Sequence, residues 1–354
     1  MSRSFSIAVI AGDGVGQEVV PAAKRVLDEA GRAGGAAFEY EDFDWGSEYY
    51  LRHGCMMPSE ALDLLRPFDA ILLGAVGHPS VPDHISLNGL LLPIRRGFDL
   101  FANVRPAVLY PGVTSPLAGR VADIDMVVVR ENAEGEYAPV GGFLYHNRPG
   151  EVAIQTAVFT RQGIERVVRF AFELALRRNG KRRVTSITKS NAQGYGMVLW
   201  DRTFQAVAEE FPQIQTESLL VDAAAMNFIR RPESFDVVVA SNLFGDILSD
   251  ISAIITGSIG LAASANLDPS RRCPSMFEPV HGSAPDIAGR GTVNPLAAIL
   301  SAGMMLEHLG LPEASRAVDR AVAALLANGG PRTPDLGGNA TTAEVTSAVV
   351  AQLR

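Results

Sequence analysis

Short apolar runs alternate with longer amphipathic segments along most of this 354-residue chain. Runs rich in β-branched residues predict buried strands, and apolar residues that recur with a period near 3.6 predict helices. The alternation predicts an α/β architecture with largely buried strands. The predicted strands are residues 6–11, 69–74, 124–129, 183–188, 217–221 and 235–240, and the predicted helices are residues 17–30, 161–179, 198–210, 294–309 and 313–327.

Size and composition limit the classes of protein that this chain can be. A chain of this length exceeds one ordinary core, so we expect roughly two domains. The net charge of −8 argues against nucleic-acid binding, which requires a basic face. The two cysteines, Cys55 and Cys273, show neither disulfide-framework nor zinc spacing, and no apolar segment is long enough to span a membrane. These properties predict a soluble cytoplasmic protein.

Two carboxylates follow the last predicted strand. Residues 242–250 read Asn-Leu-Phe-Gly-Asp-Ile-Leu-Ser-Asp, so Asp246 and Asp250 share one face if a helix begins there. Hard oxygen ligands of this kind suit Mg2+ or Mn2+, which leave their other positions to substrate and water. The structural alternative is a helix N-terminus whose acidic residues interact with the helix dipole.

A glycine-rich turn follows the first predicted strand. Residues 11–20 read Ala-Gly-Asp-Gly-Val-Gly-Gln-Glu-Val-Val, but no register gives the dinucleotide fingerprint G-x-G-x-x-G, because the third position falls on Gln17 or Val19. The glycines allow either a backbone exposed to a ligand or a purely structural turn.

Four long motifs occur in a fixed order: GDGVGQEV at 12–19, RENAEGEY at 130–137, NLFGDILSD at 242–250 and EPVHGSAPDIAG at 278–289. Together they resemble the β-decarboxylating 2-hydroxyacid dehydrogenases, the family of isopropylmalate, isocitrate, homoisocitrate, D-malate and tartrate dehydrogenases. The resemblance covers nearly the whole chain, and residues 81–96 are most similar to the tartrate and D-malate branch. The chain departs from that branch at His78 and Asn88, where its members carry tryptophan, so the pocket wall differs.

The resemblance implies an activity. This is the NAD-dependent, divalent-metal-dependent oxidative decarboxylation of a malate-type 2-hydroxy acid, with D-malate or tartrate as first choice. 3-Isopropylmalate dehydrogenase is the runner-up, followed by isocitrate or homoisocitrate dehydrogenase and by a non-catalytic regulatory relative. A monovalent cation is a further cofactor that the resemblance leaves open.

Motif by motif, the resemblance also implies a role for individual residues. NAD is favoured over NADP because a carboxylate in the adenosine loop repels a 2′-phosphate. The implied roles are Lys189 as base and Tyr137 as acid; Arg95, Arg105 and Arg130 as substrate clamp; Asp222, Asp246 and Asp250 as ligands of Mg2+ or Mn2+; Gly74, Ala75 and Val76 beside the nicotinamide; and His281, Gly282, Ser283, Ala284, Asp286 and Asn294 around the adenosine.

The implied architecture is a two-domain isopropylmalate/isocitrate dehydrogenase-like fold, not a Rossmann fold, with the active cleft between the domains. Residues 1–100 and 255–354 would form a discontinuous cofactor-binding domain, and residues 101–254 a central domain with the dimer interface. Residues 138–158 predict an extended arm or hairpin, which is either an oligomer clasp or a surface loop. In the implied homodimer, the partner chain contributes Lys189 and Asp222, and neither nucleic acid nor membrane takes part.

Overall fold

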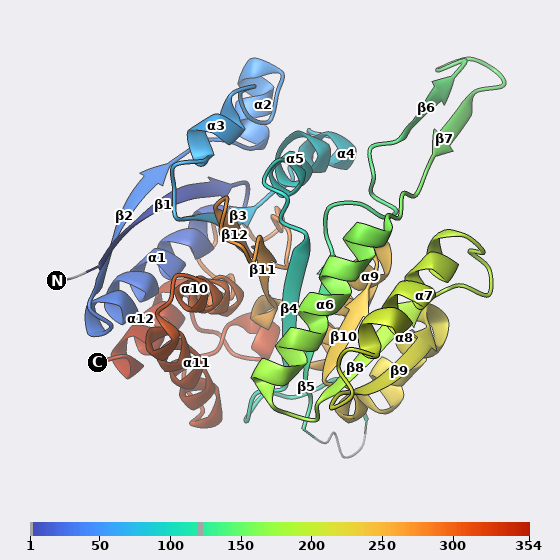
Figure 1. The fold of residues 1–354 in the computed structure, drawn as a ribbon. Helices are drawn as coiled ribbons and strands as arrows, with labels where there is room; N and C mark the ends of the chain where they lie inside the picture. Colours follow the sequence, from blue (N-terminus) through green and yellow to red (C-terminus); the bar gives the residue numbers. More distant parts are fainter. Residues whose placement is uncertain (1–2, 119–122) are drawn as a thin grey trace. The chain divides into compact units, whose positions relative to one another are not determined.

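The computed structural model describes residues 3–118 and 123–354, and it has the predicted α/β architecture (Figure 1). Backbone contacts divide the chain into two compact units. Unit 1 takes its described residues from 1–100, 105–124 and 252–354, and unit 2 takes its residues from 101–104 and 125–251. Residues 105–118, 123 and 124 therefore belong with unit 1, and Tyr110 and Val113 pack against its apolar core.

Unit 1 contains a mostly parallel sheet with the strand order β2-β1-β3-β12-β11. The strand β1 (Arg3–Gly12) pairs in parallel with β2 (Ala36–Asp42) and with β3 (Ala70–Ala75). On the other side of β3, β12 (Ser275–Pro279) is parallel to it and antiparallel to β11 (Ala263–Leu267). The first two predicted strands are thus confirmed as neighbours, and two strands from the C-terminal part of the chain extend their sheet.

Both faces of this sheet are covered, because alternate residues of each strand point to opposite sides. In β1, Ile7 and Val9 join one apolar cluster, whereas Ala8 and Ile10 join another. Burial of each of the valine and isoleucine side chains stabilises the unit by about 1.5–3 kcal/mol. The first cluster is closed by α1 (Gly16–Ala33), α10 (Leu296–His308), α11 (Pro312–Ala327) and α12 (Thr342–Gln352), and the second by α2 (Ser47–His53), α3 (Ala61–Leu65), α4 (Asp83–Ser86) and α5 (Leu92–Gly97).

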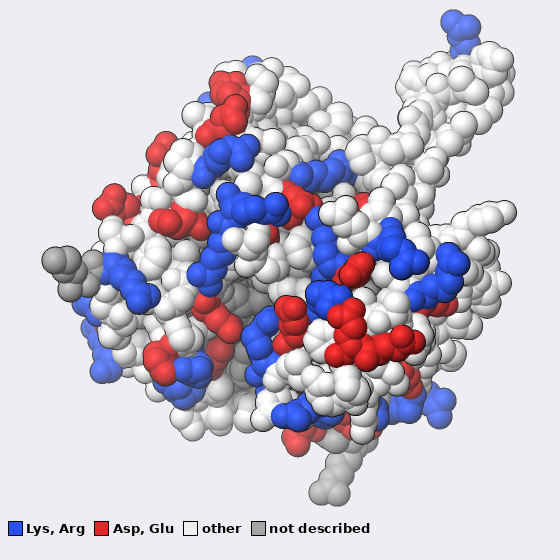
Figure 2. Space-filling model, in the orientation of Figure 1, with Lys and Arg blue, Asp and Glu red and all other residues white. Residues whose placement is uncertain are grey.

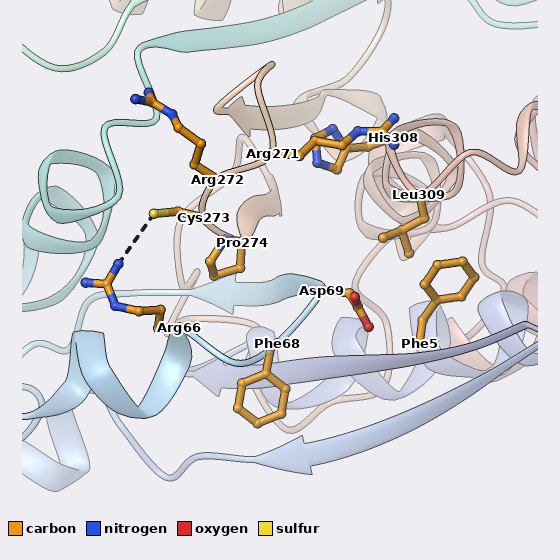
Figure 3. Close-up of a pocket in the computed structure, with 10 residues that line it drawn as sticks. All are labelled: Phe5, Arg66, Phe68, Asp69, Arg271, Arg272, Cys273, Pro274, His308 and Leu309. Carbon is orange, nitrogen blue, oxygen red and sulfur yellow. Dashed lines mark hydrogen bonds between the residues drawn. The ribbon is translucent and has the colours of Figure 1, made fainter.

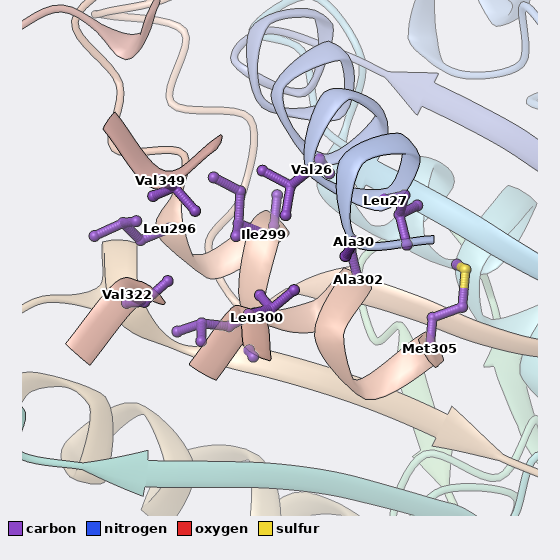
Figure 4. Close-up of a cluster of buried hydrophobic side chains, with 14 of the residues drawn as sticks. Val26, Leu27, Ala30, Leu296, Ile299, Leu300, Ala302, Met305, Val322 and Val349 are labelled. Atoms are coloured by element: carbon purple, nitrogen blue, oxygen red, sulfur yellow. The ribbon is translucent and has the colours of Figure 1, made fainter. Parts of the chain in front are cut away.

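The first cluster brings together segments from both ends of the chain (Figure 4). Val26 of α1 lies beside Ile299 of α10, Leu27 lies toward Met305, and Val322 and Val349 of α11 and α12 belong to the same cluster. All of these side chains are fully buried.

Unit 2 contains a parallel sheet with the order β5-β10-β8-β9. Its strands are β5 (Asp125–Glu131), β8 (Arg183–Thr188), β9 (Gln215–Leu220) and β10 (Val237–Ala240), and β4 (Ala102–Val108) runs from residues of unit 2 into unit 1. The remaining four predicted strands are confirmed here. The helix α6 (Arg161–Arg178) packs on β5 and β10, α7 (Gly196–Ala208) packs on α6, and α8 (Val221–Arg230) and α9 (Asn242–Ile255) follow β9 and β10.

A hairpin of β6 (Gly141–Leu144) and β7 (Val152–Gln155) extends from unit 2, so the predicted arm or hairpin is present (Figure 1). It exposes large apolar side chains, including Phe143 at 62% and Ile154 at 54% of their surface. Figure 2 shows this hairpin almost free of charged residues, while basic and acidic side chains intermingle over the rest of the face drawn. No helix within the described ranges is long and apolar enough to cross a membrane.

Candidate active site

The segment with the paired aspartates forms the predicted strand-to-helix transition. The strand β10 ends at Ala240, and α9 begins at Asn242. Asp246 and Asp250 lie four residues apart on α9 and therefore on one face, with Asp246 34% exposed and Asp250 exposed. Their accessible hard oxygens fit the donor set that Mg2+ or Mn2+ requires. Within residues 3–118 and 123–354, no three His, Cys, Asp or Glu side chains gather closely enough to hold a metal ion. The three predicted ligands therefore do not meet within one chain.

Arg130 is buried beside the start of α9. It lies near the end of β5, directly opposite Ala240 of β10, and only 2% of its side chain is exposed. Its Nε and Nη2 donate to Asn242 Oδ1 at 3.0 and 2.7 Å, and its Nη1 forms an ion pair with Asp246. This close approach depends on Gly245, because a Cβ there would lie 2.6 Å from Arg130 Cβ.

Tyr137 reaches the same aspartate. Its hydroxyl donates to Asp246 Oδ2 at 2.8 Å, and the guanidinium of Arg130 lies over its ring, 5.2 Å from the centroid. One carboxylate thus binds both a guanidinium and a phenol. The structure therefore brings together a predicted clamp residue, the predicted acid and a predicted metal ligand.

Glu131 follows Arg130 and is also buried, although sequence reasoning assigned it no role. Burial raises the pKa of its carboxyl to about 7, against the lowering effect of hydrogen bonds from the backbone N–H groups of Ala133 and Glu134. The carboxyl thereby holds the loop that leads to Tyr137.

Lys189 and Asp222 form a second pair within unit 2. Lys189 follows β8, and Asp222 lies in the first turn of α8, directly after β9. Lys189 Nζ donates to Asp222 Oδ1 at 2.7 Å, and this hydrogen bond lowers the pKa of the Asp222 carboxyl. The side chains are 28% and 60% exposed, so both remain accessible from solution.

Arg95 and Arg105 belong to unit 1 and are both buried. Arg95, in α5, donates through Nη2 to Glu278 Oε1 at 2.7 Å, and Glu278 also accepts from Asn266 Nδ2 at 2.8 Å. Arg95 Nε is buried without a hydrogen-bond partner in the described part of the chain. The carboxylate of Glu278, a contact that the sequence did not predict, thus binds one nitrogen of this predicted clamp residue. Arg105 lies in β4.

Three of the predicted cofactor residues, His281, Ala284 and Asn294, line a cavity of about 280 Å³ in unit 1. His281 Nδ1 donates to Gly282 O at 2.9 Å, and its Nε2 is buried with no partner among the described residues. Burial lowers the pKa of this imidazole, so it is neutral at pH 7 and Nε2 is an acceptor. Asn294 Nδ2 donates to Asp335 Oδ2 at 2.9 Å. Asp335 also lines the cavity, a residue that sequence reasoning missed.

The other predicted cofactor residues are not among those that line this cavity. Gly282 and Asp286 are exposed, and Ser283 is buried, with its carbonyl accepting from Val15 N at 2.9 Å. Gly74 and Ala75 end β3, and Val76 follows them.

The glycine-rich turn after β1 has a structural explanation. Gly12 and Gly14 have φ values of +68° and +53°, which L side chains rarely adopt. A Cβ on Gly12 would lie 2.0 Å from Ala75 O, and one on Gly14 would lie 2.1 Å from Ser283 O. These contacts favour the structural alternative, in which the turn packs between two other segments of unit 1.

Asp13, within the same turn, is a buried anchor that sequence reasoning missed. Its carboxylate accepts from Ser47 N at 2.8 Å, from Ser47 Oγ at 2.7 Å and from Gly77 N at 2.8 Å. It thereby fixes the segment that carries Val76.

A further cavity of about 260 Å³ in unit 1 contains none of the predicted site residues (Figure 3). Arg66 Nη1 donates to Cys273 Sγ at 3.6 Å on one side of it. On the other side lies His308, whose pKa is lowered to about 4 by burial and by Arg271. Asp69, which also lines the cavity, accepts hydrogen bonds from Ser6 of β1.

The chain is similar to known dehydrogenases in both sequence and structure. The pattern of the family described as isocitrate/isopropylmalate dehydrogenase matches residues 6–349. A probable tartrate dehydrogenase/decarboxylase of Bacillus subtilis (strain 168) is 53% identical over 99% of both chains. D-malate dehydrogenase (decarboxylating) of Escherichia coli (strain K12) is 50% identical over 99% of this chain and 98% of that protein. The crystal structure of isocitrate dehydrogenase from Methylococcus capsulatus superposes with a TM-score of 0.90 at 36% identity and covers 99% of each chain.

Proposed function

The chain belongs to the isocitrate/isopropylmalate dehydrogenase family, and we propose that it catalyses the NAD-dependent and divalent-metal-dependent oxidative decarboxylation of D-malate or tartrate. The observation that carries this proposal is the shared carboxylate of Asp246, which binds both Arg130 and Tyr137. Asp246 as a cation ligand is thus in contact with Arg130 as a carboxylate-binding group and with Tyr137 as a proton donor. The relatives named as tartrate and D-malate dehydrogenases support the choice of substrate.

Three residues of unit 2 have separate roles in the proposed reaction: one binds a substrate carboxylate, one is the base and one is the acid. Arg130 binds a substrate carboxylate through its guanidinium. Lys189, which the partner subunit would contribute to each site, would accept the proton of the substrate hydroxyl at Nζ, and its hydrogen bond to Asp222 orients the amine. NAD, when bound, would supply the hydride acceptor. After carbon dioxide leaves, the Tyr137 hydroxyl donates its proton to the substrate carbon.

The metal would be held by Asp246 and Asp250 of one subunit together with Asp222 of the partner subunit. The failure of three ligands to meet within one chain supports this sharing. When bound, a divalent cation lowers the pKa of the substrate hydroxyl and stabilises the negative charge that develops on decarboxylation.

The cavity around His281 fits the adenosine part of a dinucleotide. Val15, Ile259 and Ile287 supply apolar walls, and the buried acceptor His281 Nε2 can receive a hydrogen bond from the exocyclic amino group of a purine. The preference for NAD rests on the carboxylate of Asp286, which repels a 2′-phosphate.

A homodimer is part of the proposal. The β6–β7 hairpin exposes Phe143 and Ile154, and α8 exposes Met226 and Ile229, each by more than half of its surface. Exposed apolar side chains of this size are typical of a subunit contact. Both cysteines are free thiols, which suits a reducing cytoplasm.

The test is a substrate panel with purified protein. D-malate, tartrate and 3-isopropylmalate are each supplied with NAD or NADP, and reduced cofactor and carbon dioxide are measured. We expect turnover of D-malate or tartrate with NAD, its loss in excess EDTA, and a sharp fall in metal affinity in Asp246→Asn. Full activity in EDTA would refute the metal-dependent reaction, and preferred turnover of 3-isopropylmalate would replace the proposed substrate.

A further inference from the structure

Asn242, the first residue of α9, uses both ends of its side-chain amide inside unit 2. It is 2% exposed, and its Oδ1 accepts from Arg130 Nε at 3.0 Å and from Arg130 Nη2 at 2.7 Å. Its Nδ2 donates to Glu134 O at 3.0 Å. Only one orientation of the amide satisfies both partners, because a guanidinium can only donate and a carbonyl can only accept.

The residues on either side of Asn242 are fixed to the same loop. Glu136 Oε1 accepts from Ser241 Oγ at 2.7 Å, and its Oε2 accepts from Leu243 N at 3.1 Å. Three consecutive residues of the β10–α9 junction are thus bound to residues 134 and 136, immediately before Tyr137. The loop and the first turn of α9 therefore form one hydrogen-bonded body.

This arrangement determines the direction in which Arg130 points. An arginine side chain has several rotatable bonds and loses conformational entropy when it is ordered. Two hydrogen bonds to one oxygen fix the Nε–Nη2 edge of the guanidinium, and Asp246 holds Nη1. With the plane of the guanidinium fixed in advance, a substrate carboxylate meets a prepared donor array rather than a mobile cation.

We infer that Asn242 is a positioning residue, which acts on the substrate through Arg130 without touching it. The inference rests on the proposed role of Arg130 as a carboxylate clamp. Because a clamp binds the ground state and the transition state alike, loss of Asn242 should raise KM for the hydroxy acid more than it lowers kcat. The KM for NAD should not follow, since the predicted cofactor residues lie in unit 1.

The chain offers a matched control at the opposite end of the same strand. Asp236 precedes β10, is 1% exposed, and accepts from Arg178 Nε at 3.2 Å and from Arg183 N at 3.3 Å. Asp236→Ala and Asn242→Ala each deprive one arginine of a buried partner within unit 2. Only the second variant disturbs Arg130.

The experiment measures KM, kcat and unfolding midpoints for Asn242→Ala, Asn242→Asp and Asp236→Ala. We expect Asn242→Ala to raise KM for the hydroxy acid at least about tenfold, with KM for NAD within about twofold of wild type. Asn242→Asp keeps the acceptor oxygens and should recover most of the loss. Asp236→Ala should lower the midpoint and leave KM unchanged. An unchanged KM in Asn242→Ala, or an equal rise in Asp236→Ala, would overturn the inference.

A second readout separates this inference from the proposed function. In protein labelled with 15N-arginine, the Nε–H of Arg130, identified through Arg130→Lys, should exchange slowly with solvent in wild type and faster in Asn242→Ala. Equal exchange in the two proteins overturns the positioning role whatever the activity. Slow exchange in a wild type that turns over none of the panel substrates rejects the proposed function alone.

Discussion

The close approach of α9 to β5 predicts opposite effects for the same substitution at two helical glycines. A Cβ at Gly245 would lie 2.6 Å from Arg130 Cβ and 3.1 Å from Arg130 Cα, atoms that cannot swing away from their own backbone. In α10, a Cβ at Gly303 would meet Val318 Cγ1 at 3.4 Å, an ordinary contact. Replacing glycine by alanine inside a helix stabilises it by about 0.5–1 kcal/mol. Gly303→Ala should therefore stabilise unit 1 by about that amount.

At Gly245 the same gain is opposed by overpacking, which costs about 1–3 kcal/mol. The net expectation for Gly245→Ala is a loss of up to about 2 kcal/mol, and turnover should fall because Asp246 is displaced relative to Arg130. Each unit has its own fluorophore for urea titrations, since the two tryptophans are Trp45 in unit 1 and Trp200 in unit 2. Each glycine variant is therefore read in a background that retains only the tryptophan of its own unit. Equal stabilisation by both variants would show that α9 does not press against Arg130.

Three further predictions address electrostatics and assembly. Burial raises the pKa of the Glu131 carboxyl from 4.5 to about 7, so the protonated carboxyl contributes to the free energy of unfolding. This contribution is fully present below about pH 4.5 and is lost as pH rises through 7. Glu131→Gln should remove up to about 3 kcal/mol of the pH dependence of stability, and parallel stability–pH curves for the two proteins would contradict the raised pKa. Asp286→Ala should narrow the NAD over NADP preference in kcat/KM by at least about tenfold, or ~1.4 kcal/mol, and an unchanged ratio would remove Asp286 as the discriminating residue. Co-refolding Lys189→Ala with Asp246→Asn chains should restore about a quarter of wild-type activity, since each mixed dimer regains one intact site; inactive mixed dimers, confirmed by differential tagging, would rule out shared sites.

All six predicted strands are present. Five of them are mostly buried, and a strand covered on both faces needs apolar residues on both, whereas β9 is an edge strand whose residues are exposed or half-buried. The edge strand β2 alternates polar residues and was missed. The strand β12 carries the charged Glu278, whose partner Arg95 lies 183 residues away, so no local pattern could have indicated its burial.

The sequence named candidate residues for the site, but it did not indicate the contacts between them. The motif 242–250 supplied the two aspartates, and its first residue, Asn242, gained a role only from the contact with Arg130 across 112 residues. Asp13 was equally hidden, because its partners Ser47 and Gly77 come from separate segments. Side-chain pairs between distant segments depend on tertiary packing, which local periodicity does not encode.

The mixed origin of unit 1 affects the order in which a ribosome can complete the two units. Residues 125–251 of unit 2 are one continuous stretch, whereas the sheet of unit 1 places β3 between β1 and β12. During synthesis, Leu72 of β3 is made long before Phe277, its neighbour in β12, and before Ile299 of the same apolar cluster. Unit 2 can therefore finish folding while the N-terminal strands still lack half of their cover. Until the last helices emerge, the face of those strands that belongs to the first apolar cluster remains partly uncovered.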